Sequence, residues 1–128
     1  MPDSGTLRDD LLVYATSLAK YLTSPAGNAL DRTLASAGDD PITQQLRDQY
    51  WDARYAQPGQ IAARAIKRGE LPEATDPRFV LELLVAPLHF RIVLTREPLD
   101  PDLPARIVDA LLHGLLPAAD GPPRSRLS

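Results

Sequence analysis

An aspartate followed at once by a proline occurs three times in this sequence, at Asp40-Pro41, Asp76-Pro77 and Asp100-Pro101. An aspartate side chain caps the free N–H groups at the start of a helix, and proline fits the first helical position because that position needs no N–H. Apolar residues at helical spacing follow each pair. No run of alternating apolar and polar residues competes with this pattern, so the sequence predicts an all-α fold.

Five helices are expected from these starts and from the proline and glycine residues between them. Their predicted ranges are 7–24, 25–38, 41–68, 77–94 and 101–116. Pro58 should kink or break the third helix near Gln57, and Pro87 should bend the fourth. With 128 residues the chain fits one domain over 6–117, between a flexible N-terminus at 1–5 and a disordered, proline-rich tail at 118–128.

The composition argues against several classes of protein. The absence of cysteine excludes disulfides and thiolate metal sites, and it fits a reducing cytoplasm. A net charge of −3 and a pI near 5.3 make the chain a poor partner for nucleic acid, whose binding depends on neutralising phosphates. No phosphate-binding loop, nucleophile elbow or HExxH motif is present, so we expect no catalysis and no cofactor. Glu82, His89 and His113 lack metal-ligand spacing, so we also expect no metal.

Nothing in the sequence indicates a signal peptide or a membrane span. The first residues are polar and acidic, unlike a signal peptide. The longest apolar stretch is interrupted by Glu82, Pro87, His89 and Arg91, and it is shorter than the ~18 residues that a span requires. We therefore expect a protein without membrane contact, in the cytoplasm.

The last two predicted helices are apolar around most of their circumference. The fourth reads VLELLVAPLHFRIVL, and the fifth adds leucine, isoleucine and valine on two adjacent stripes. A helix this apolar is either central in its domain or covered by another molecule. Since both helices can hardly be central, we expect a homodimer. The alternative is a monomer in which the fourth helix is wholly internal.

A family resemblance rests on strings in every predicted helix. These are GTLRDDLL at the start, SPAGNALDRTLASAGDDP across the second helix, and QLRDQYWDAR followed by IAARAIKRGEL in the third. DPRFVLELLVAPLHFRIVLTREPLD in the fourth and VDALLHGLLP in the fifth complete the set. Their order over residues 5–117 resembles the C-terminal ligand-binding and dimerisation domain of the tetracycline-repressor (TetR) family of transcriptional regulators.

The resemblance implies that the last two helices form a four-helix bundle with their copies in a second subunit. It also implies a pocket between the first, third and fourth helices for a small, apolar or aromatic effector. Effector binding in such regulators releases DNA from an N-terminal helix-turn-helix domain. Only six residues precede Leu7, so we expect this chain to lack that domain and to reach DNA only through it. Pro58-Gly59 departs from the family pattern, in which the third helix would continue.

Aromatic and polar side chains of three helices are candidates for the pocket. Trp51 and Tyr55 lie four residues apart and so share a helix face, and His89 lies among apolar residues. The predicted ligand-binding residues are Tyr14, Tyr21, Tyr50, Trp51, Arg54, Tyr55 and His89. Core packing is the alternative for the large aromatics, and a hydrogen-bonded core or interface position is the alternative for the histidine. The tyrosines of the first helix fit exposed positions equally well.

The predicted dimer interface lies on the last two helices. It comprises Leu84, Leu88, Arg91, Ile107, Val108, Leu111, Leu112 and Leu115. The leading hypothesis is therefore an effector-binding and homodimerisation domain of a TetR-like regulator, and the alternative is a stand-alone helical protein-interaction module without a pocket. A third interpretation makes GDDPITQQLRDQYW a DNA-reading helix-turn-helix, which the acidic loop and the net negative charge disfavour.

Overall fold

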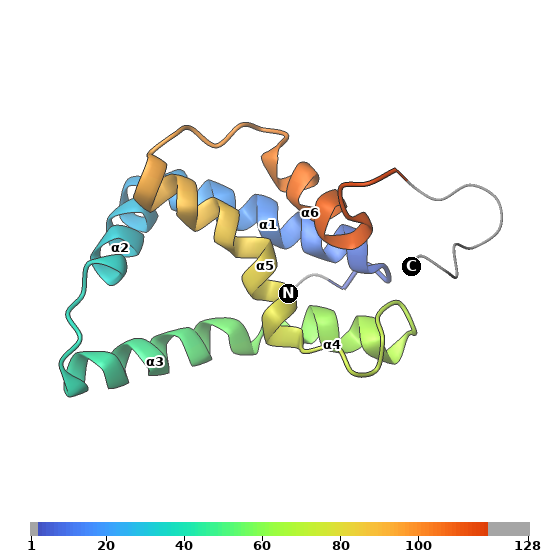
Figure 1. Ribbon diagram of the computed structural model, residues 1–128, viewed down its shortest axis with the longest axis horizontal. Helices are drawn as coiled ribbons and strands as arrows, with labels where there is room; N and C mark the ends of the chain where they lie inside the picture. Colours follow the sequence, from blue (N-terminus) through green and yellow to red (C-terminus); the bar gives the residue numbers. More distant parts are fainter. Residues whose placement is uncertain (1–2, 118–128) are drawn as a thin grey trace.

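Six α-helices and one π-helical segment make up the part of the chain that the computed structural model describes, residues 3–117 (Figure 1). The elements are α1 (Leu7–Thr23), α2 (Pro25–Ala35), α3 (Pro41–Ala56), α4 (Gly59–Lys67), α5 (Pro77–His89), η1 (Phe90–Thr95) and α6 (Leu103–His113). No strand occurs within this range, and the predicted all-α fold is confirmed. The tail predicted to be disordered, 118–128, lies outside the described residues, as do positions 1–2 of the N-terminus predicted to be flexible.

Two of the three aspartate–proline pairs start helices where the sequence predicts them. Asp40 and Asp76 each accept a hydrogen bond from a backbone N–H of the first turn, both at 3.0 Å. The third pair, Asp100-Pro101, precedes its helix by two residues, since α6 begins at Leu103 without a side-chain cap. This helix also ends earlier than expected, because Gly114 adopts a φ of 77° that leaves the helical region.

The predicted third helix is divided in two. Proline has no N–H, so Pro58 cannot continue the ladder of backbone hydrogen bonds. The turn that replaces it is closed by bonds from the N–H of Gln60 to the carbonyl of Gln57 and from Ile61 to Pro58, at 3.1 and 2.9 Å. Pro58 therefore breaks this helix into α3 and α4, which accounts for the sixth helix where five were expected.

The fourth predicted helix, 77–94, corresponds to α5 and η1, and it changes its winding rather than simply bending at Pro87. It is α-helical to His89 and continues as the wider π-helical η1 to Thr95. Arg96 then ends it in the left-handed region with a φ of 59°. A π-helical turn is a common feature of functional sites, and this one lies next to the pocket described below.

Helix α5 runs through the centre of the fold, between a layer of α1, α2 and α6 and a layer of α3 and α4 (Figure 1). Its residues Leu81, Leu84 and Leu88 have no exposed surface and pack in one core with α1, α4 and α6. The opposite side of α5 and η1 remains uncovered, so the fourth helix is central but not wholly internal. By contrast, α3 contributes no buried side chain, and it stands away from the core to form one side of a pocket.

Candidate functional site

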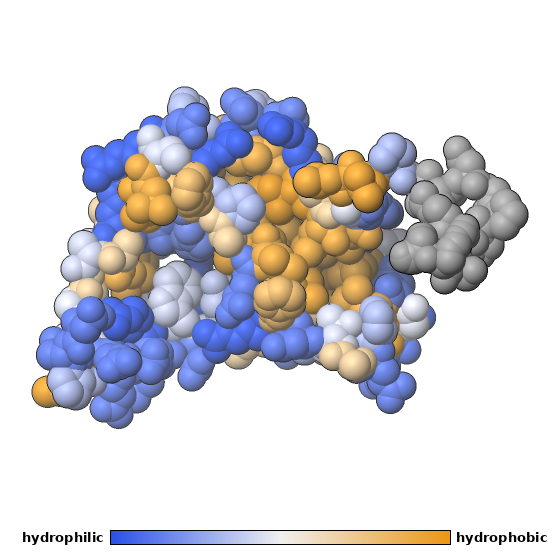
Figure 2. Space-filling model, in the orientation of Figure 1, coloured by the Kyte–Doolittle hydropathy of each residue, from blue (hydrophilic) through white to orange (hydrophobic). Residues whose placement is uncertain are grey.

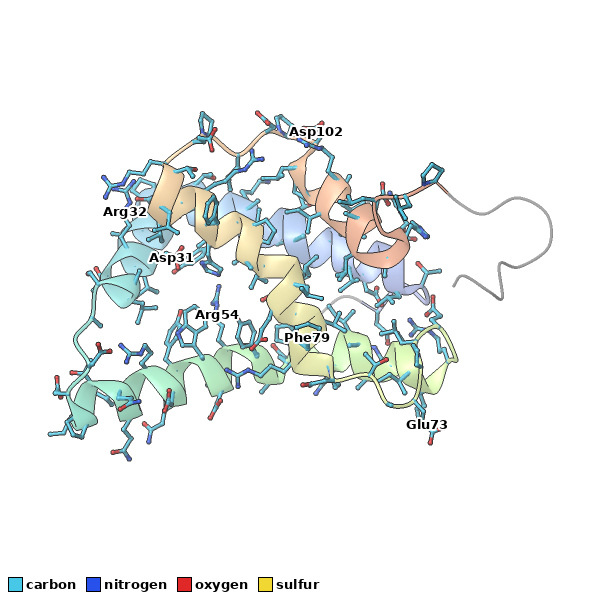
Figure 3. The ribbon with its side chains drawn as sticks, in the orientation of Figure 1. Asp31, Arg32, Arg54, Glu73, Phe79 and Asp102 are labelled. Atoms are coloured by element: carbon cyan, nitrogen blue, oxygen red, sulfur yellow. The ribbon has the colours of Figure 1, made fainter. Side chains whose placement is uncertain are left out.

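A pocket of about 770 Å³ opens between α2, α3, α5 and η1. It is lined by Asp31, Leu34, Ala35, Ala37, Asp39, Arg47, Trp51, Tyr55, Glu82, Val85, Ala86, His89, Phe90, Val93 and Leu94. Figure 3 shows Asp31 on α2 and Arg54 on α3 at facing sides of the gap between these helices. A mainly apolar lining with a few polar groups, in a volume of this size, is typical of small-molecule sites.

The wall that α3 supplies is aromatic. Trp51 and Tyr55 stack with their ring centroids 5.6 Å apart and their planes at 23°, as the four-residue spacing predicts. The ring of His89 meets Trp51 edge to face at 5.8 Å. Burial raises the pKa of the Tyr55 hydroxyl, which therefore stays protonated and able to donate a hydrogen bond over a wide pH range. Flat, partly polar walls of this kind suit a planar ligand.

A buried carboxylate and an imidazole form the polar centre of the lining. His89 Nδ1 lies 2.8 Å from both carboxylate oxygens of Asp31, although 58 residues separate the two in sequence. Asp31 is only 6% exposed. Gly27, one turn earlier on the same face, allows α2 to approach the end of α1, because a Cβ there would lie 2.0 Å from the carbonyl oxygen of Tyr21. That close approach holds Asp31 beside His89.

The other charged side chains of the pocket lie at its rim. Arg47 pairs with Asp39 at 3.1 Å, and it also donates to the carbonyl oxygen of Gly38 at 3.1 Å. Glu82 lies 3.7 Å from Arg78 on the neighbouring turn. The lining thus holds three carboxylates and one guanidinium that is already paired.

The seven predicted ligand-binding residues fall into three groups. Trp51, Tyr55 and His89 line the pocket together. Tyr21, Tyr50 and Arg54 line a much smaller hollow of about 10 Å³ behind it, which Trp51 and His89 also border. Within that hollow the Arg54 guanidinium lies 5.5 Å from the centre of the Tyr21 ring. Tyr14 lines neither space, since it is half-buried against the core, and burial raises its pKa.

Sequence reasoning missed the contribution of α2 and, apart from His89, those of α5 and η1. Asp31 is the most important omission. The sequence offers one local signal for it, the glycine Gly27 four residues earlier on the same helix face. The partner of Asp31, His89, lies 58 residues away and gives no local signal. Val85, Ala86 and Phe90 were missed because an apolar run does not reveal which of its sides faces a cavity.

A second feature is an exposed apolar surface on α5, η1 and α6, which we call the outer face. Its members on α5 and η1 are Phe79, Leu83, Phe90 and Leu94, which are 55%, 44%, 52% and 68% exposed. A groove of about 530 Å³ lies between α5 and α6, with Leu83, Pro87 and Leu111 among its walls. Figure 2 shows an extended hydrophobic area over α5 and α6 in this region. Single exposed apolar residues are ordinary, but an extended patch marks an interaction surface.

The structure separates the predicted interface residues by their burial. Leu84, Leu88 and Val108 have no exposed surface, so they have none left to bury against a second copy of the chain. Ile107 is 9% exposed and lines the groove with Leu111.

The remaining three residues differ in how much surface they present. Leu112 is partly buried against the core. Leu115 is 90% exposed at the end of the groove. Arg91 lies 3.7 Å from Asp100 in its own chain. Of the original eight, the groove residues and Leu112 are those with surface left to offer a second subunit.

Residues 3–117 contain no group of three histidine, aspartate or glutamate side chains placed to hold a metal ion. No helix in this range combines the length and apolarity that a membrane span requires.

Known proteins similar to this chain are transcriptional regulators. The chain is 31% identical over 114 residues to the HTH-type transcriptional regulator AqdR of Rhodococcus erythropolis, covering 89% of this chain and 55% of that protein. It is 29% identical over 99 residues to the uncharacterized HTH-type transcriptional regulator YdeS of Bacillus subtilis, covering 76% and 50%. With the uncharacterized HTH-type transcriptional regulator Mb1581 of Mycobacterium bovis it shares 26% identity over 120 residues, or 94% and 59%.

The fold and these relatives define the class: a helical regulatory domain of the kind found in transcriptional regulators. The chain belongs to the family described as the tetracyclin repressor-like C-terminal domain, which matches residues 1–111. The resemblance inferred from the sequence is thereby confirmed. The chain spans about half the length of the curated relatives it matches.

Proposed function

We propose that this chain is the effector-binding and homodimerisation part of a TetR-like transcriptional regulator. The observation that carries the proposal is the pocket of about 770 Å³ with its aromatic wall, directly beside the outer face. A ligand in the pocket touches Phe90 and Leu94, which also belong to the outer face, so effector binding and subunit packing share side chains. The role is regulatory rather than enzymatic, and it is exercised in the cytoplasm.

In this proposal DNA contact belongs to a helix-turn-helix domain outside this sequence. The relatives are HTH-type regulators, and the chain covers only 50–59% of the three described above. The segment at the start of α3 is poorly suited to bind DNA itself, because the negative charges of Asp39 and Asp40 would repel the DNA phosphates. The effector therefore acts on DNA binding through the dimer.

The pocket is tested with a pair of substitutions on one helix. Ala35 and Ala29 are both exposed residues of α2, but only Ala35 lines the pocket, so Ala35→Phe places a bulky ring at the pocket wall and Ala29→Phe is its matched control. A library of apolar and aromatic compounds is screened by thermal shift, since a ligand at 100 times its Kd stabilises a protein by about 2.7 kcal/mol. We expect hits with wild type and Ala29→Phe that are lost in Ala35→Phe. A library without hits would contradict the effector role.

The dimer is tested by sedimentation equilibrium. Leu83 lies in the outer face at 44% exposure, and Leu30 on α2 is 37% exposed outside it. A stable interface buries about 800 Å² per partner around an apolar centre, which a charge at that centre disrupts. We expect a wild-type dimer that Leu83→Arg converts to a monomer and Leu30→Arg leaves intact. A wild-type monomer at micromolar concentration would refute dimerisation.

The stand-alone interaction module is the second candidate, and the outer face is the observation that favours it. It predicts the opposite combination of results: no compound stabilises the chain, and Leu83 contacts a different protein. The presence of the pocket is what makes us prefer the effector-binding role.

A further inference from the structure

The fold determines which ring nitrogen of His89 carries the hydrogen when the imidazole is neutral. Asp31 is a buried carboxylate that can only accept hydrogen bonds, and Nδ1 lies 2.8 Å from both of its oxygens. The hydrogen of a neutral ring is therefore held on Nδ1, and the other nitrogen, Nε2, carries a lone pair. Among the described residues none forms a hydrogen bond with Nε2, and the His89 side chain keeps 24% of its surface exposed at the pocket.

The surrounding charges limit what can approach Nε2. Arg47 pairs with Asp39 at 3.1 Å and Arg78 lies 3.7 Å from Glu82. Asp31, beside His89, is therefore the lining carboxylate without an arginine partner among the described residues. A ligand that enters as an anion meets this carboxylate and finds no unpaired guanidinium in the lining to hold it. A neutral hydroxyl group meets no such barrier, and it can donate its hydrogen to the Nε2 lone pair. The rings of Trp51 and Tyr55 beside it favour a planar aromatic frame.

We propose that the effector is an aromatic molecule with a ring hydroxyl, whose O–H donates to Nε2 of His89 while its ring lies against Trp51 and Tyr55. This inference rests on the proposed function, in which the pocket binds an effector. One proton is shared along the hydrogen bond. If it moves from the ligand oxygen to Nε2, an imidazolium lies between the new phenolate and the Asp31 carboxylate, and the total charge is unchanged.

Four naphthalene compounds test the proposal on the wild-type protein by isothermal titration calorimetry. They are 2-naphthol, its methyl ether 2-methoxynaphthalene, unsubstituted naphthalene and the anion 2-naphthoate. We expect 2-naphthol to bind about tenfold more tightly than the ether and naphthalene, because one additional hydrogen bond contributes about a factor of ten. We expect naphthoate to bind more weakly than 2-naphthol. Equal affinities for the first three compounds, or tighter binding of naphthoate, would overturn the proposal.

A substitution at Asp31 tests how the proton on His89 is controlled. In Asp31→Leu no side chain accepts from Nδ1, so the ring hydrogen is no longer held there; the neutral ring then takes mainly the Nε2–H form that a free imidazole prefers, and Nε2 donates rather than accepts. The preference for 2-naphthol over its ether should fall from about tenfold to below about threefold. Asp39→Leu makes the same chemical change at the rim of the pocket and should retain the full preference. A full preference of about tenfold in Asp31→Leu overturns the proposal.

Two measurements keep these results interpretable. If Asp31→Leu does not fold, nitrogen-15 NMR of the wild-type imidazoles still decides, because 2-naphthol should shift the Nε2 resonance of His89 and the ether should not. The chain has two histidines, so His113→Gln assigns the signals. If none of the four compounds binds, the inferred aromatic hydroxyl ligand fails, and the library screen described above decides separately whether the pocket binds an effector. If all bind alike, the pocket stands and only the hydroxyl inference fails.

Discussion

The close approach of α1 and α2 at Gly27 makes a quantitative prediction about stability. A Cβ at this position would lie 2.0 Å from the backbone oxygen of Tyr21 and 2.8 Å from its carbonyl carbon. Both atoms belong to the backbone, so relief requires one of the two helices to move. Overpacking of this kind costs about 3 kcal/mol, and the better helix propensity of alanine returns about 1 kcal/mol. We therefore expect Gly27→Ala to lower the free energy of unfolding by about 2 kcal/mol.

Gly59 provides the matched control, because a Cβ there meets no atom within 4 Å. Gly59→Ala should leave stability unchanged or raise it by up to about 1 kcal/mol. Thermal unfolding followed by circular dichroism, at one protein concentration, should show Gly27→Ala melting about 8 °C below wild type, at roughly 4 °C per kcal/mol for a chain of this size. Because α2 carries Asp31, the same variant should also bind aromatic ligands more weakly. A Gly27→Ala protein as stable as Gly59→Ala would refute the reasoning.

Three further results are expected. Leu88→Ala removes a side chain with no exposed surface and should cost about 2–5 kcal/mol in urea unfolding, whereas Leu94→Ala at 68% exposure should cost far less. The backbone N–H and the hydroxyl of Thr43 donate to Asp40 and lower its pKa below 3.8, so its contribution to stability is present above pH 3.8 and is lost as pH falls through the lowered value. Asp40→Asn should accordingly flatten the pH dependence of the melting temperature in that acid range. Spectrophotometric titration should show Tyr14 and Tyr55 ionising above the usual tyrosine pKa of 10, because burial disfavours the phenolate, and Tyr55→Phe should make that late phase smaller and leave the part due to Tyr14.

Local signals in the sequence were enough to predict the helices. Asp40 and Asp76 start helices because a cap and a proline act within a single turn, and Pro58 ends one for the same reason. The helix predicted to start at Asp100-Pro101 starts two residues later, at Leu103, because this aspartate and proline are separated from the first apolar turn.

The site was predicted less completely, because it depends on contacts between distant segments. Trp51 and Tyr55 were paired correctly from their spacing, which a helix converts directly into a shared face. Asp31 was missed because its role arises only when α2 meets α5. Leu84 and Leu88 were assigned to a dimer interface because an all-round apolar helix does not indicate which side its own domain covers.

Helix α3 contributes no buried side chain and yet supplies one whole wall of the pocket. Tyr55 packs against the core, but most other positions of α3 are exposed or half-buried, and substitutions at exposed positions usually change stability by less than about 0.5 kcal/mol. Mutations at the exposed positions of this helix can therefore alter the surface beside the pocket while the chain keeps its fold. If the chain acts as we propose, such a domain can exchange one signal molecule for another during evolution by single steps, each through a protein that still folds.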